Sequence, residues 1–552
     1  MRKFSTLIIV FIFLISCQPE EIAAPVADSN SQHPQSTASL AIEVDNIAQL
    51  KNMKIPSKEH NLVNVLGYHQ PGDGGGGTFM WKEASVKAPD KGTSIASRFR
   101  EKGRWIRIFK DGINVKWFGA KGNGTSDDFP ALNSAFLYGE RNSVDVFIPA
   151  GKYMILSGQS STTGFELNQP SNFSISGETG TTLSTPLGEK GGFKIFYLKY
   201  GGENLNIKNI SFENTQNFPR HRTTAIQTIQ GGGEPLRNLS ISNCSFSGFT
   251  TAILPNGTED LVITNNKFFA PNGRDSALEN RDPAVFIWLH SNTNGKTVNT
   301  TIRDCYAEGY SGGDIMSTVT QEPFDGFLYG MGNGVIVQNN KIRKMGYEAI
   351  FLQPNSEFVS SAQKNPVIIT NNDIGFEWMG RMKDHRTYGI RVDDSAVQIK
   401  ENRIENATFG VLIYGYDYSF EFSDLEIQNN SIETTAAHGY NPRAVFVQGN
   451  RTKPVRNIRI ANNSISLKGS SLSNNSELFF VADVTSGIIA DNNFEIEAGK
   501  NGHELSLVGF DRQNSDFCLY ANKGTGDFDR VYSELKPSGN TNFVFDPGEC
   551  KQ

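Results

Sequence analysis

The chain has 552 residues and a formal net charge of −6, and 20% of its residues are charged. Its length allows a large buried core, and its mild negative charge excludes the basic surface that nucleic-acid binding requires. The 54 glycines, 38 phenylalanines and 16 tyrosines favour a turn-rich β protein with aromatic side chains for its core and for a sugar-binding face.

The first residues predict export. Arg2 and Lys3 precede an apolar run over residues 7–15 that is too short to span a membrane. The run and the Leu-Ile-Ser-Cys that ends it resemble a bacterial lipoprotein signal over residues 1–17, which implies that Cys17 is the lipidated first residue of the mature protein; an ordinary secretory signal is the alternative. Residues 18–40 are rich in Pro and Ser and predict a disordered tether. We therefore expect a protein of the cell envelope, anchored by its lipid at the outer membrane or cell surface, and contacting the membrane only there.

Residues 41–112 predict a small N-terminal β module. Its most distinctive stretch is GYHQPGDGGGGTFMW, from Gly67 to Trp81. No Gly-Lys-Ser/Thr follows the glycine run and a strand does, so the run is not a phosphate-binding loop. The stretch resembles the β modules that precede β-helices of the phage-tailspike and pectate-lyase types.

A capping helix is expected next. Ser126, Asp127 and Asp128 are typical of a helix N-terminus, and Pro130 is tolerated in a first helical turn. A helix that starts near Ser126 would cover the open end of a stack of strands, whose edge must be protected.

Ten copies of one short pattern follow at steps of 22–39 residues: Ile or Val, any residue, Asn or Asp in most copies, any residue, then an apolar residue. Repeats at this period indicate stacked units, and their apolar alternation indicates strands without intervening helices. We expect one parallel strand per coil of a β-solenoid, all in one sheet, with a strand starting at each of Ile207, Ile241, Ile263, Ile302, Val337, Ile369, Ile399, Ile427, Ile460 and Ile489.

One column of the repeat is dominated by Asn. An Asn tolerates the left-handed bend between two strands, and stacked copies can pass amide hydrogen bonds from coil to coil. Cys244 and Cys305 occupy the same column two coils apart, about 9–10 Å, which is too far for a disulfide; we interpret both as small buried residues. The column contains Asn266, Asn340, Asn372, Asn402, Asn430, Asn463 and Asn492.

The pattern FGA-GNGTSDD…AL followed by IPAGKY, residues 118–153, identifies a family resemblance. It resembles the opening of the rhamnogalacturonase/epimerase-type pectate-lyase superfamily, and with the repeats the resemblance extends to about residue 500. It implies an all-β right-handed parallel β-helix over residues 113–500 that acts on polysaccharides. The superfamily contains hydrolases, lyases, epimerases and non-catalytic members, so the resemblance does not specify a reaction. The Gly-His-Gly and Arg-Ile-Lys elements of polygalacturonases and the Asp-Pro-His of mannuronan epimerases are missing.

Residues 501–552 are expected to cap the other end. Cys518 and Cys550 both lie there, and export permits disulfides, so we predict that they pair.

A second strand is expected in each coil, with one residue in two facing outward. We aligned strands starting at Ala225, Ala284, Gly313, Glu348, Tyr388, Phe409 and Arg443. Three outward columns result: Glu348, Tyr388 and Arg443; Phe286, Met316, Phe351, Arg391, Leu412 and Phe446; and His290, Gln353, Asp393, Tyr414 and Gln448.

These columns predict a polysaccharide groove centred on outward-facing Arg391 and Asp393, walled by long aromatic loops. Hydrolysis needs two carboxyl groups, and Glu348 and Asp393 are expected to lie about 17 Å apart, too far for either stereochemical outcome. A loop carboxylate such as Asp417 would then be the partner of Asp393. The GIRVDD strand also resembles the catalytic strand of iota-carrageenase-type hydrolases. The predicted catalytic set is Asp393, Arg391, His385 and Asp417, and the predicted substrate-binding set is Tyr388, Gln353, Tyr414, Glu348, Trp378, Phe351 and His290.

Three functions stay open. We expect a glycoside hydrolase for an acidic or sulfated polysaccharide. A polysaccharide lyase is the second hypothesis: Arg391 would neutralise a uronate carboxylate and His385, Tyr388 or Tyr414 would take the C5 proton. A glycan-binding surface protein without turnover is the third. No carboxylate cluster has calcium-ligand spacing, so no metal or cofactor is assigned, although many lyases of this fold use calcium. An oligomer stays open.

Overall fold

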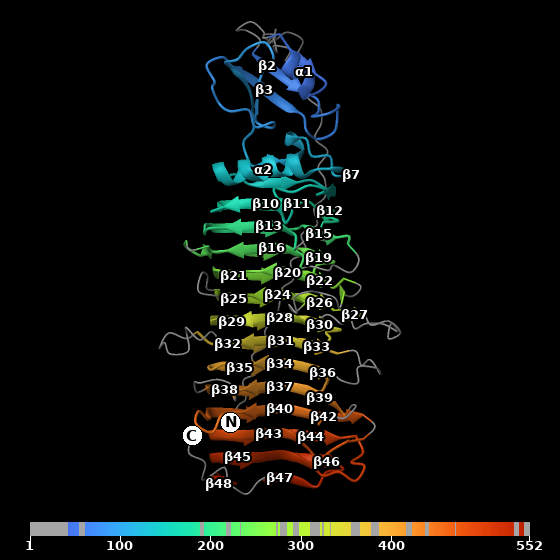
Figure 1. The fold of residues 1–552 in the computed structure, drawn as a ribbon, viewed down its shortest axis with the longest axis vertical. Helices are drawn as coiled ribbons and strands as arrows, with labels where there is room; N and C mark the ends of the chain where they lie inside the picture. Colours follow the sequence, from blue (N-terminus) through green and yellow to red (C-terminus); the bar gives the residue numbers. More distant parts are fainter. Residues whose placement is uncertain are drawn as a thin grey trace, which may run out of the picture. The chain divides into compact units, whose positions relative to one another are not determined.

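The computed structural model describes residues 42–54, 61–187, 192–216, 222–231, 233–271, 274–275, 284–290, 297–309, 321–322, 325–331, 333–354, 365–376, 386–415, 422–436, 441–469, 471–534 and 540–545. Within them the chain forms a small N-terminal β module and a right-handed parallel β-helix with three faces (Figure 1). None of the helices in the described ranges is long and apolar enough to cross a membrane.

The N-terminal module is one five-stranded sheet with a short helix, in the order β1-β2-β3-β5-β4. Val63, Phe79, Trp81 and Trp105 form its core together with residues of the helix. The module is built from β1 (Ile42–Val44), α1 (Ile47–Asn52), β2 (Leu62–Val65), β3 (Gly77–Lys82), β4 (Ser94–Ile95) and β5 (Arg104–Arg107).

The first face of the β-helix, which we call face A, carries the second strand of each coil. Its strands, in stacking order, are β10 (Thr163–Asn168), β13 (Lys194–Lys199), β16 (Thr224–Ile229), β20 (Thr251–Leu254), β24 (Val285–Leu289), β28 (Gly326–Met331), β31 (Glu348–Gln353), β34 (Tyr388–Val392), β37 (Phe409–Tyr414), β40 (Arg443–Gln448), the first halves of β43 (Ser476–Ala490) and β45 (Leu505–Tyr520), and β47 (Arg530–Glu534).

Face B carries the Ile/Val positions of the repeat. Its strands are β6 (Ile113–Asn114), β8 (Val146–Ile148), β11 (Ser171–Gly177), β14 (Glu203–Lys208), β17 (Leu236–Arg237), β18 (Ser240–Ser242), β21 (Thr258–Thr264), β25 (Val298–Arg303), β29 (Asn333–Gln338), β32 (Val367–Thr370), β35 (Val397–Lys400), β38 (Ser423–Gln428), β41 (Val455–Ala461), the second halves of β43 and β45, and β48 (Thr541–Val544).

Face C is a separate sheet of 14 strands. Its strands are β7 (Asn123–Asp127), β9 (Gly151–Met154), β12 (Thr181–Thr185), β15 (Ser211–Asn214), β19 (Ser245–Ser247), β22 (Lys267–Phe269), β26 (Tyr306–Glu308), β30 (Lys341–Arg343), β33 (Asp373–Gly375), β36 (Arg403–Ala407), β39 (Ser431–Ala436), β42 (Ser464–Gly469), β44 (Asn493–Ile496) and β46 (Lys523–Gly526). Two further strands, β23 (Arg274–Asp275) and β27 (Gln321–Glu322), pair antiparallel with each other.

The predicted register of the repeat is confirmed. The ten Ile/Val positions are direct neighbours on face B, from Ile207 opposite Ile241 through Ile399 opposite Ile427 to Ile460 opposite Ile489, and all pairs are parallel. The prediction that strands start at these positions is wrong, because each Ile lies near the end of its strand. The repeat therefore marks the corner between faces B and C.

The sequence analysis assigned both the left-handed bend and the amide hydrogen bonds to one column of Asn residues, but in the structure they belong to two adjacent columns. The residue before each buried Asn adopts the left-handed conformation, as in Asn371 (φ 54°) and Asn429 (φ 58°). The buried column makes the predicted amide ladder: Asn372 donates to Asn402 (2.9 Å), and Asn402 donates to Asn430 (3.1 Å). Each amide also donates to a backbone carbonyl of the preceding coil, as Asn402 does to Ile369 (2.8 Å). The ladder continues through Asn463 and Asn492 to Asn522.

The two cysteines of this column behave as predicted. Cys244 and Cys305 are buried and free, and burial raises the pKa of each thiol to about 12. Cys518 is disulfide-bonded; its predicted partner Cys550 lies outside the described residues, as does Cys17.

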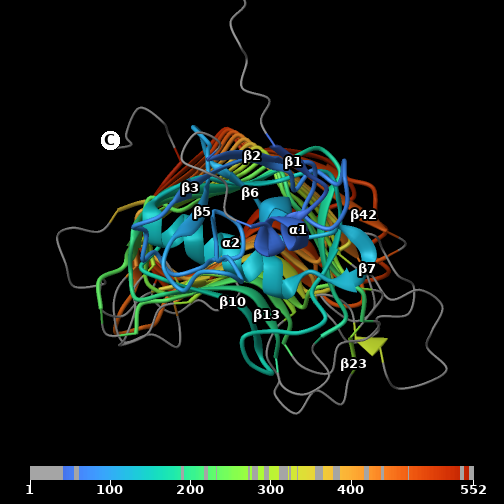
Figure 2. The ribbon, with the colours of Figure 1, turned by 90° about the horizontal axis from the view of Figure 1, so that it is seen from above.

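The capping helix is present but begins later than predicted. Helix α2 spans Phe129–Asn142 and follows η1 (Val115–Phe118) and β7. Asp128 makes no capping bond with its side chain, because its carboxylate accepts hydrogen bonds from the backbone N–H groups of Lys121 and Gly122. Leu132, Ala135 and Phe136 form part of the buried side of α2. The helix lies across the end of the stack (Figure 2).

The stack continues further than predicted at the other end. Strands β45, β46, β47 and β48 extend the three faces by parallel pairing. The described residues after 501 are therefore further coils, and the expected separate cap over 501–552 is wrong for them.

Candidate functional site

The outer surface of face A carries a stripe of aromatic and charged side chains over strands β31 to β43. One column contains Glu348, Tyr388, Phe409 and Arg443 in direct register. A second column contains Phe351, Arg391, Leu412, Phe446 and Phe480, and Tyr329 and Trp288 continue it onto β28 and β24. The stripe therefore follows the axis of the β-helix.

Glutamate and phenylalanine three residues apart share this outer surface because the two residues between them both face inward. Ala349 and Ile350 belong to the core. On the next strands Gly389 and Gly410 occupy the Ala349 position, where a Cβ would lie 2.6 Å from Ile404 Cγ2 and 2.3 Å from Ile432 Cγ2. A strict alternation of side chains does not hold at the start of these strands.

Arg391 joins two carboxylates at one end of the stripe. Its guanidinium lies 4.2 Å from the ring centre of Phe351 on the preceding coil. Nη1 donates to Glu348 (3.2 Å), and Nε and Nη2 donate to one oxygen of Asp393 (3.1 and 2.8 Å). The other oxygen of Asp393 accepts from the Tyr414 backbone N–H (3.0 Å).

These contacts shift two pKa values. Burial raises the pKa of Glu348 to about 7, against the opposing effect of Arg391. Burial disfavours the charge on Arg391, but the carboxylates of Asp393 and Glu348 outweigh it and raise the pKa of the guanidinium. Glu348 is thus a carboxyl group that can hold a proton near neutral pH.

Arg443 makes a matching arrangement at the other end. Its guanidinium lies 4.0 Å from the ring centre of Phe480 and 5.0 Å from that of Phe446, and Nη2 donates to Glu477 (3.2 Å). Nε is buried without a hydrogen-bond partner among the described residues. Burial lowers the pKa of Arg443, which Glu477 opposes, and burial raises the pKa of Glu477, which Arg443 opposes.

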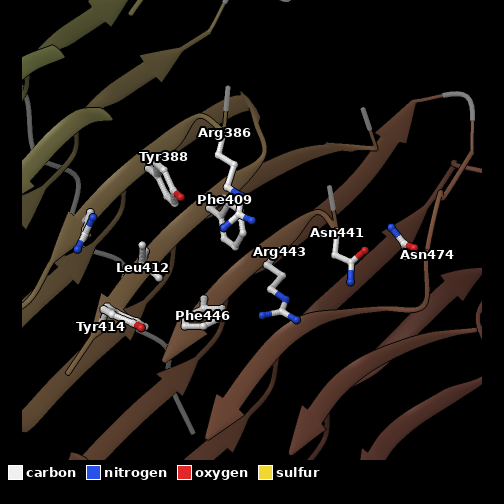
Figure 3. Close-up of a pocket in the computed structure, with 10 residues that line it drawn as sticks. Arg386, Tyr388, Phe409, Leu412, Tyr414, Asn441, Arg443, Phe446 and Asn474 are labelled. Carbon is white, nitrogen blue, oxygen red and sulfur yellow. The ribbon is translucent and has the colours of Figure 1, made fainter. Parts of the chain in front are cut away.

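A pocket of about 440 Å³ on face A is lined by both arginines, and Figure 3 shows Arg443 beside Phe446 in it. Tyr388, Phe409, Leu412 and Phe446 belong to one apolar cluster outside the main core, with Tyr414 packed against it. None of the described residues that line the pocket is a carboxylate. The lining residues are Arg386, Tyr388, Arg391, Phe409, Leu412, Tyr414, Asn441, Arg443, Phe446 and Asn474.

Two predictions about the centre of the groove are wrong. Asp393 does not face outward: it lies just after the end of β34, where its carboxylate is 0% exposed beneath Arg391. Glu348 and Asp393 are not separated by the expected 17 Å, because both bond to the guanidinium of Arg391. The long arginine side chain leans over Phe351 to reach the preceding coil, which counting residues along strands did not anticipate.

Other predicted residues are distributed along the stripe. Tyr388 and Tyr414 line the pocket. Phe351 supports Arg391, and Gln353 interacts with Tyr329 on the neighbouring strand. His290 lies beside Trp288 (5.9 Å between ring centres), two coils away from Gln353. His385, Asp417 and Trp378 lie outside the described residues.

The column assignment fails in two earlier coils. Phe286 is buried in the main core, and Trp288 takes the predicted outward position. The strand between β24 and β31 is β28, at residues 326–331; the predicted strand at residue 313 and Met316 lie outside the described residues.

Sequence reasoning also missed Arg386, Asn441, Asn474 and Glu477. Arg386 and the two asparagines precede their strands, where alternation gives no signal. Glu477 had a signal: Glu477-Leu-Phe-Phe480 repeats the Glu-x-x-Phe spacing of Glu348-Ala-Ile-Phe351.

The described part of the chain contains no group of three or more His, Cys, Asp or Glu side chains that could hold a metal ion. The pocket lining is cationic and amide-bearing, a donor set that fits an anion rather than a cation. The use of calcium, which the sequence left open, stays untested.

Comparisons with known proteins agree with this fold. Residues 112–377 match the model of the family described as rhamnogalacturonase A/epimerase, pectate lyase-like, and residues 43–110 match the phage tail protein small four-stranded β-sheet domain. A search of curated proteins gave no match.

Solved structures share the fold at low identity. A mutant tailspike protein of E. coli bacteriophage HK620, in complex with a pentasaccharide, is 11% identical with a TM-score of 0.54, over 83% of this chain and 85% of the tailspike. PfbA, a surface adhesin of Streptococcus pneumoniae, is 14% identical with a TM-score of 0.50, over 78% of this chain and 93% of the adhesin. Over residues 112–377 the chain is therefore similar to the rhamnogalacturonase A/epimerase, pectate lyase-like family, and the solved structures share its parallel β-helix fold.

Proposed function

We propose that the protein is an enzyme that binds an acidic polysaccharide in the pocket of face A and cleaves it by β-elimination. The observation that carries this proposal is the composition of the pocket: three arginines and two tyrosines line it, and no carboxylate among the described residues does. Hydrolysis would need two carboxyl groups at the scissile bond, whereas elimination needs a cation for the uronate carboxylate and a proton acceptor.

Arg443 is better placed than Arg391 to hold the carboxylate of the sugar that reacts, and Arg391 would contact an anionic group farther along the glycan. Arg391 already bonds to two carboxylates, whereas the described ion pair of Arg443 is with Glu477 alone. Neutralisation of the uronate acidifies its C5 proton. Tyr388 or Tyr414, both in the lining, would accept that proton as the phenolate; a C4=C5 double bond forms as the C4–O bond breaks, and the phenol so formed, or water, gives a proton to the leaving oxygen.

A glycoside hydrolase is the second candidate, and one observation favours it. Glu348, with its pKa raised to about 7, could act as a proton donor. The burial of Asp393 beneath Arg391 opposes its use as nucleophile or base. This ranking reverses the order predicted from the sequence.

The test exposes the purified protein to uronate-containing and sulfated polysaccharides and measures reducing ends together with the ultraviolet absorbance of unsaturated products. Elimination raises both signals. Reducing ends without absorbance would overturn elimination in favour of hydrolysis, and retention in affinity electrophoresis without either signal would leave a binding protein. Export and lipid attachment at Cys17 are further proposals, tested by metabolic labelling with a fatty acid and by the Cys17→Ser variant.

A further inference from the structure

The two ends of the pocket are built from the same three residue types. At one end Glu348 and Phe351 of β31 contact Arg391 of β34; at the other, Glu477 and Phe480 of β43 contact Arg443 of β40. In each case the Glu precedes the Phe by three residues, and the arginine comes from the neighbouring strand on the pocket side. We call these two groups the Arg391 unit and the Arg443 unit.

The spacing of the two units is fixed by the coils. Strands β34 and β40 are two steps apart on face A, and β31 and β43 are four steps apart. Each guanidinium leans outward over a Phe of the farther strand, so their separation lies between two and four strand spacings, about 10–19 Å. The rigid ladder of parallel strands keeps this distance constant.

The surface between the units is suited to sugar rings. Tyr388 and Phe409 stack at 5.0 Å, and Phe446 lies 4.8 Å from Phe480 at the Arg443 end. Flat apolar rings contact sugar faces while guanidinium groups recognise carboxylate or sulfate. One pyranose of an extended chain advances by about one strand spacing, so charges two to four spacings apart lie on the first and last of about three to five sugars.

From this geometry we propose that the two arginine units measure the substrate: the pocket binds a segment of about four sugars, running parallel to the β-helix axis, with one anionic group held at each end. This inference rests on the proposed function and adds the length and charge spacing of the ligand. The sugars between the two ends need carry no charge. The pocket would therefore select glycans by the distance between their charged groups rather than by their total charge.

The test is calorimetric titration of the full chain with uronic-acid oligosaccharides of two to eight units, with sulfated and carboxyl-reduced series in parallel. If the wild type cleaves them, the titrations use the Tyr388→Phe/Tyr414→Phe variant. We expect the tetrasaccharide to bind about tenfold or more tightly than the disaccharide, because the second charged hydrogen-bonded contact is gained there. The affinity of longer oligosaccharides should rise only by the statistical factor that comes from the larger number of positions in which they can occupy the pocket.

Variants at the Arg443 unit test directly whether the two arginine units select glycans by length. Arg443→Ala should remove the advantage of the tetrasaccharide over the disaccharide, whereas Arg343→Ala, which removes an ion-paired arginine on face C, should not. Glu477→Gln should tighten tetrasaccharide binding, because Arg443 keeps its charge and loses its competing carboxylate; a misfolded variant could not show this gain.

The outcomes separate the two proposals. If the protein cleaves the polymer but its affinity for oligosaccharides rises smoothly with their length, selection by length is overturned and the proposed function stands. The same holds if Arg443→Ala keeps the gain in affinity from disaccharide to tetrasaccharide. Binding of the carboxyl-reduced series equal to that of the charged ones would also overturn selection by length. Neither binding nor cleavage of any anionic glycan would overturn both. A step only with the sulfated series would identify sulfate as the recognised group.

Discussion

The guanidinium of Arg391 donates two hydrogen bonds to a single oxygen of Asp393, 3.1 Å from Nε and 2.8 Å from Nη2. Asp393 is fully buried, and its second oxygen accepts the Tyr414 N–H of the next coil. The carboxylate therefore fixes both the arginine and the strand β37 behind the pocket.

Asp393→Ala should destabilise the fold, because Asp393 has a structural role and takes no direct part in the reaction. The change removes a buried carboxylate, leaves Arg391 with Glu348 as its described acceptor and leaves the Tyr414 N–H without the acceptor it has now, so we expect the free energy of unfolding to fall by about 2–4 kcal/mol. Urea unfolding followed by fluorescence measures it. Asp373→Ala breaks partly exposed pairs with Arg343 and Arg403 on face C and should change stability by only about 0–1 kcal/mol. A fully stable but inactive Asp393→Ala protein would instead show a direct role in the reaction.

Glu348 should make stability depend on pH. Its pKa is raised from 4.5 to about 7 in the folded chain, so between these values the folded state retains a proton that the unfolded state has lost. Stability from this group is complete below pH 4.5 and is lost as pH rises through about 7, by an amount on the order of 3 kcal/mol. The difference in urea midpoint between wild type and Glu348→Gln should follow this curve.

Glu213 provides a control of opposite sign. Burial raises its pKa, but hydrogen bonds from Lys152 and Ser184 outweigh burial and lower it. Its contribution is therefore present at neutral pH and lost on acidification, and the difference between wild type and Glu213→Gln should vanish as pH falls. Parallel curves for the two glutamates would contradict the assignment of Glu348.

Arg443→Ala should reduce turnover of the cleaved polysaccharide. Loss of a charged hydrogen bond to the substrate costs about 1.5–3 kcal/mol, so kcat/KM should fall by about 10- to 100-fold. The matched variant Arg343→Ala should retain wild-type kcat/KM, because Arg343 lies on face C and pairs with Asp373. Equal losses in both variants would show that stability, not substrate binding, had changed.

The amide ladder should be costly to interrupt. Asn402 accepts hydrogen bonds from the side chain and backbone of Asn372 and donates to Asn430 and the Ile369 carbonyl. Asn402→Ala leaves several of these buried groups unsatisfied, so we expect a loss of about 2–5 kcal/mol in unfolding free energy. Gln398→Ala, on the partly exposed outer surface of the same coil, should change stability little. A ladder variant as stable as that control would contradict this account.

One position offers a gain in stability. Glu401 adopts φ 59° in the column where Asn371 and Asn429 have the same left-handed conformation. Asn tolerates this conformation better than Glu, so Glu401→Asn should stabilise the chain by about 0.5–1 kcal/mol. Thermal unfolding measures the gain, and the reverse change Asn371→Glu should lower the melting temperature.

The repeat was predictable because its residues are chosen by local geometry. A left-handed corner selects Asn at Asn371 and Asn429, and the buried amide column selects Asn402 and its neighbours, so the pattern repeats in each coil. The helix boundary was less accessible, because Asp128 serves the preceding loop instead of the helix terminus.

The site was only partly predictable because its charged side chains interact with partners from neighbouring coils. Tyr388, Tyr414 and Arg443 were found by aligning the strands of face A into outward columns. The approach of Arg391 to Glu348 depends on a side chain that leans across to another strand. The burial of Asp393 depends on the turn after β34, and periodicity carries no information on either feature.

The amide ladder also predicts how the protein responds to a pulling force. Each rung joins residues 28–33 positions apart, as between Asn402 and Asn430 or Asn430 and Asn463. Detaching a terminal coil breaks one rung and exposes the next, so a chain pulled from its C-terminus should peel away coil by coil. Each event would release about 30 residues, roughly 100 Å of extended chain, giving a regular sawtooth in single-molecule extension.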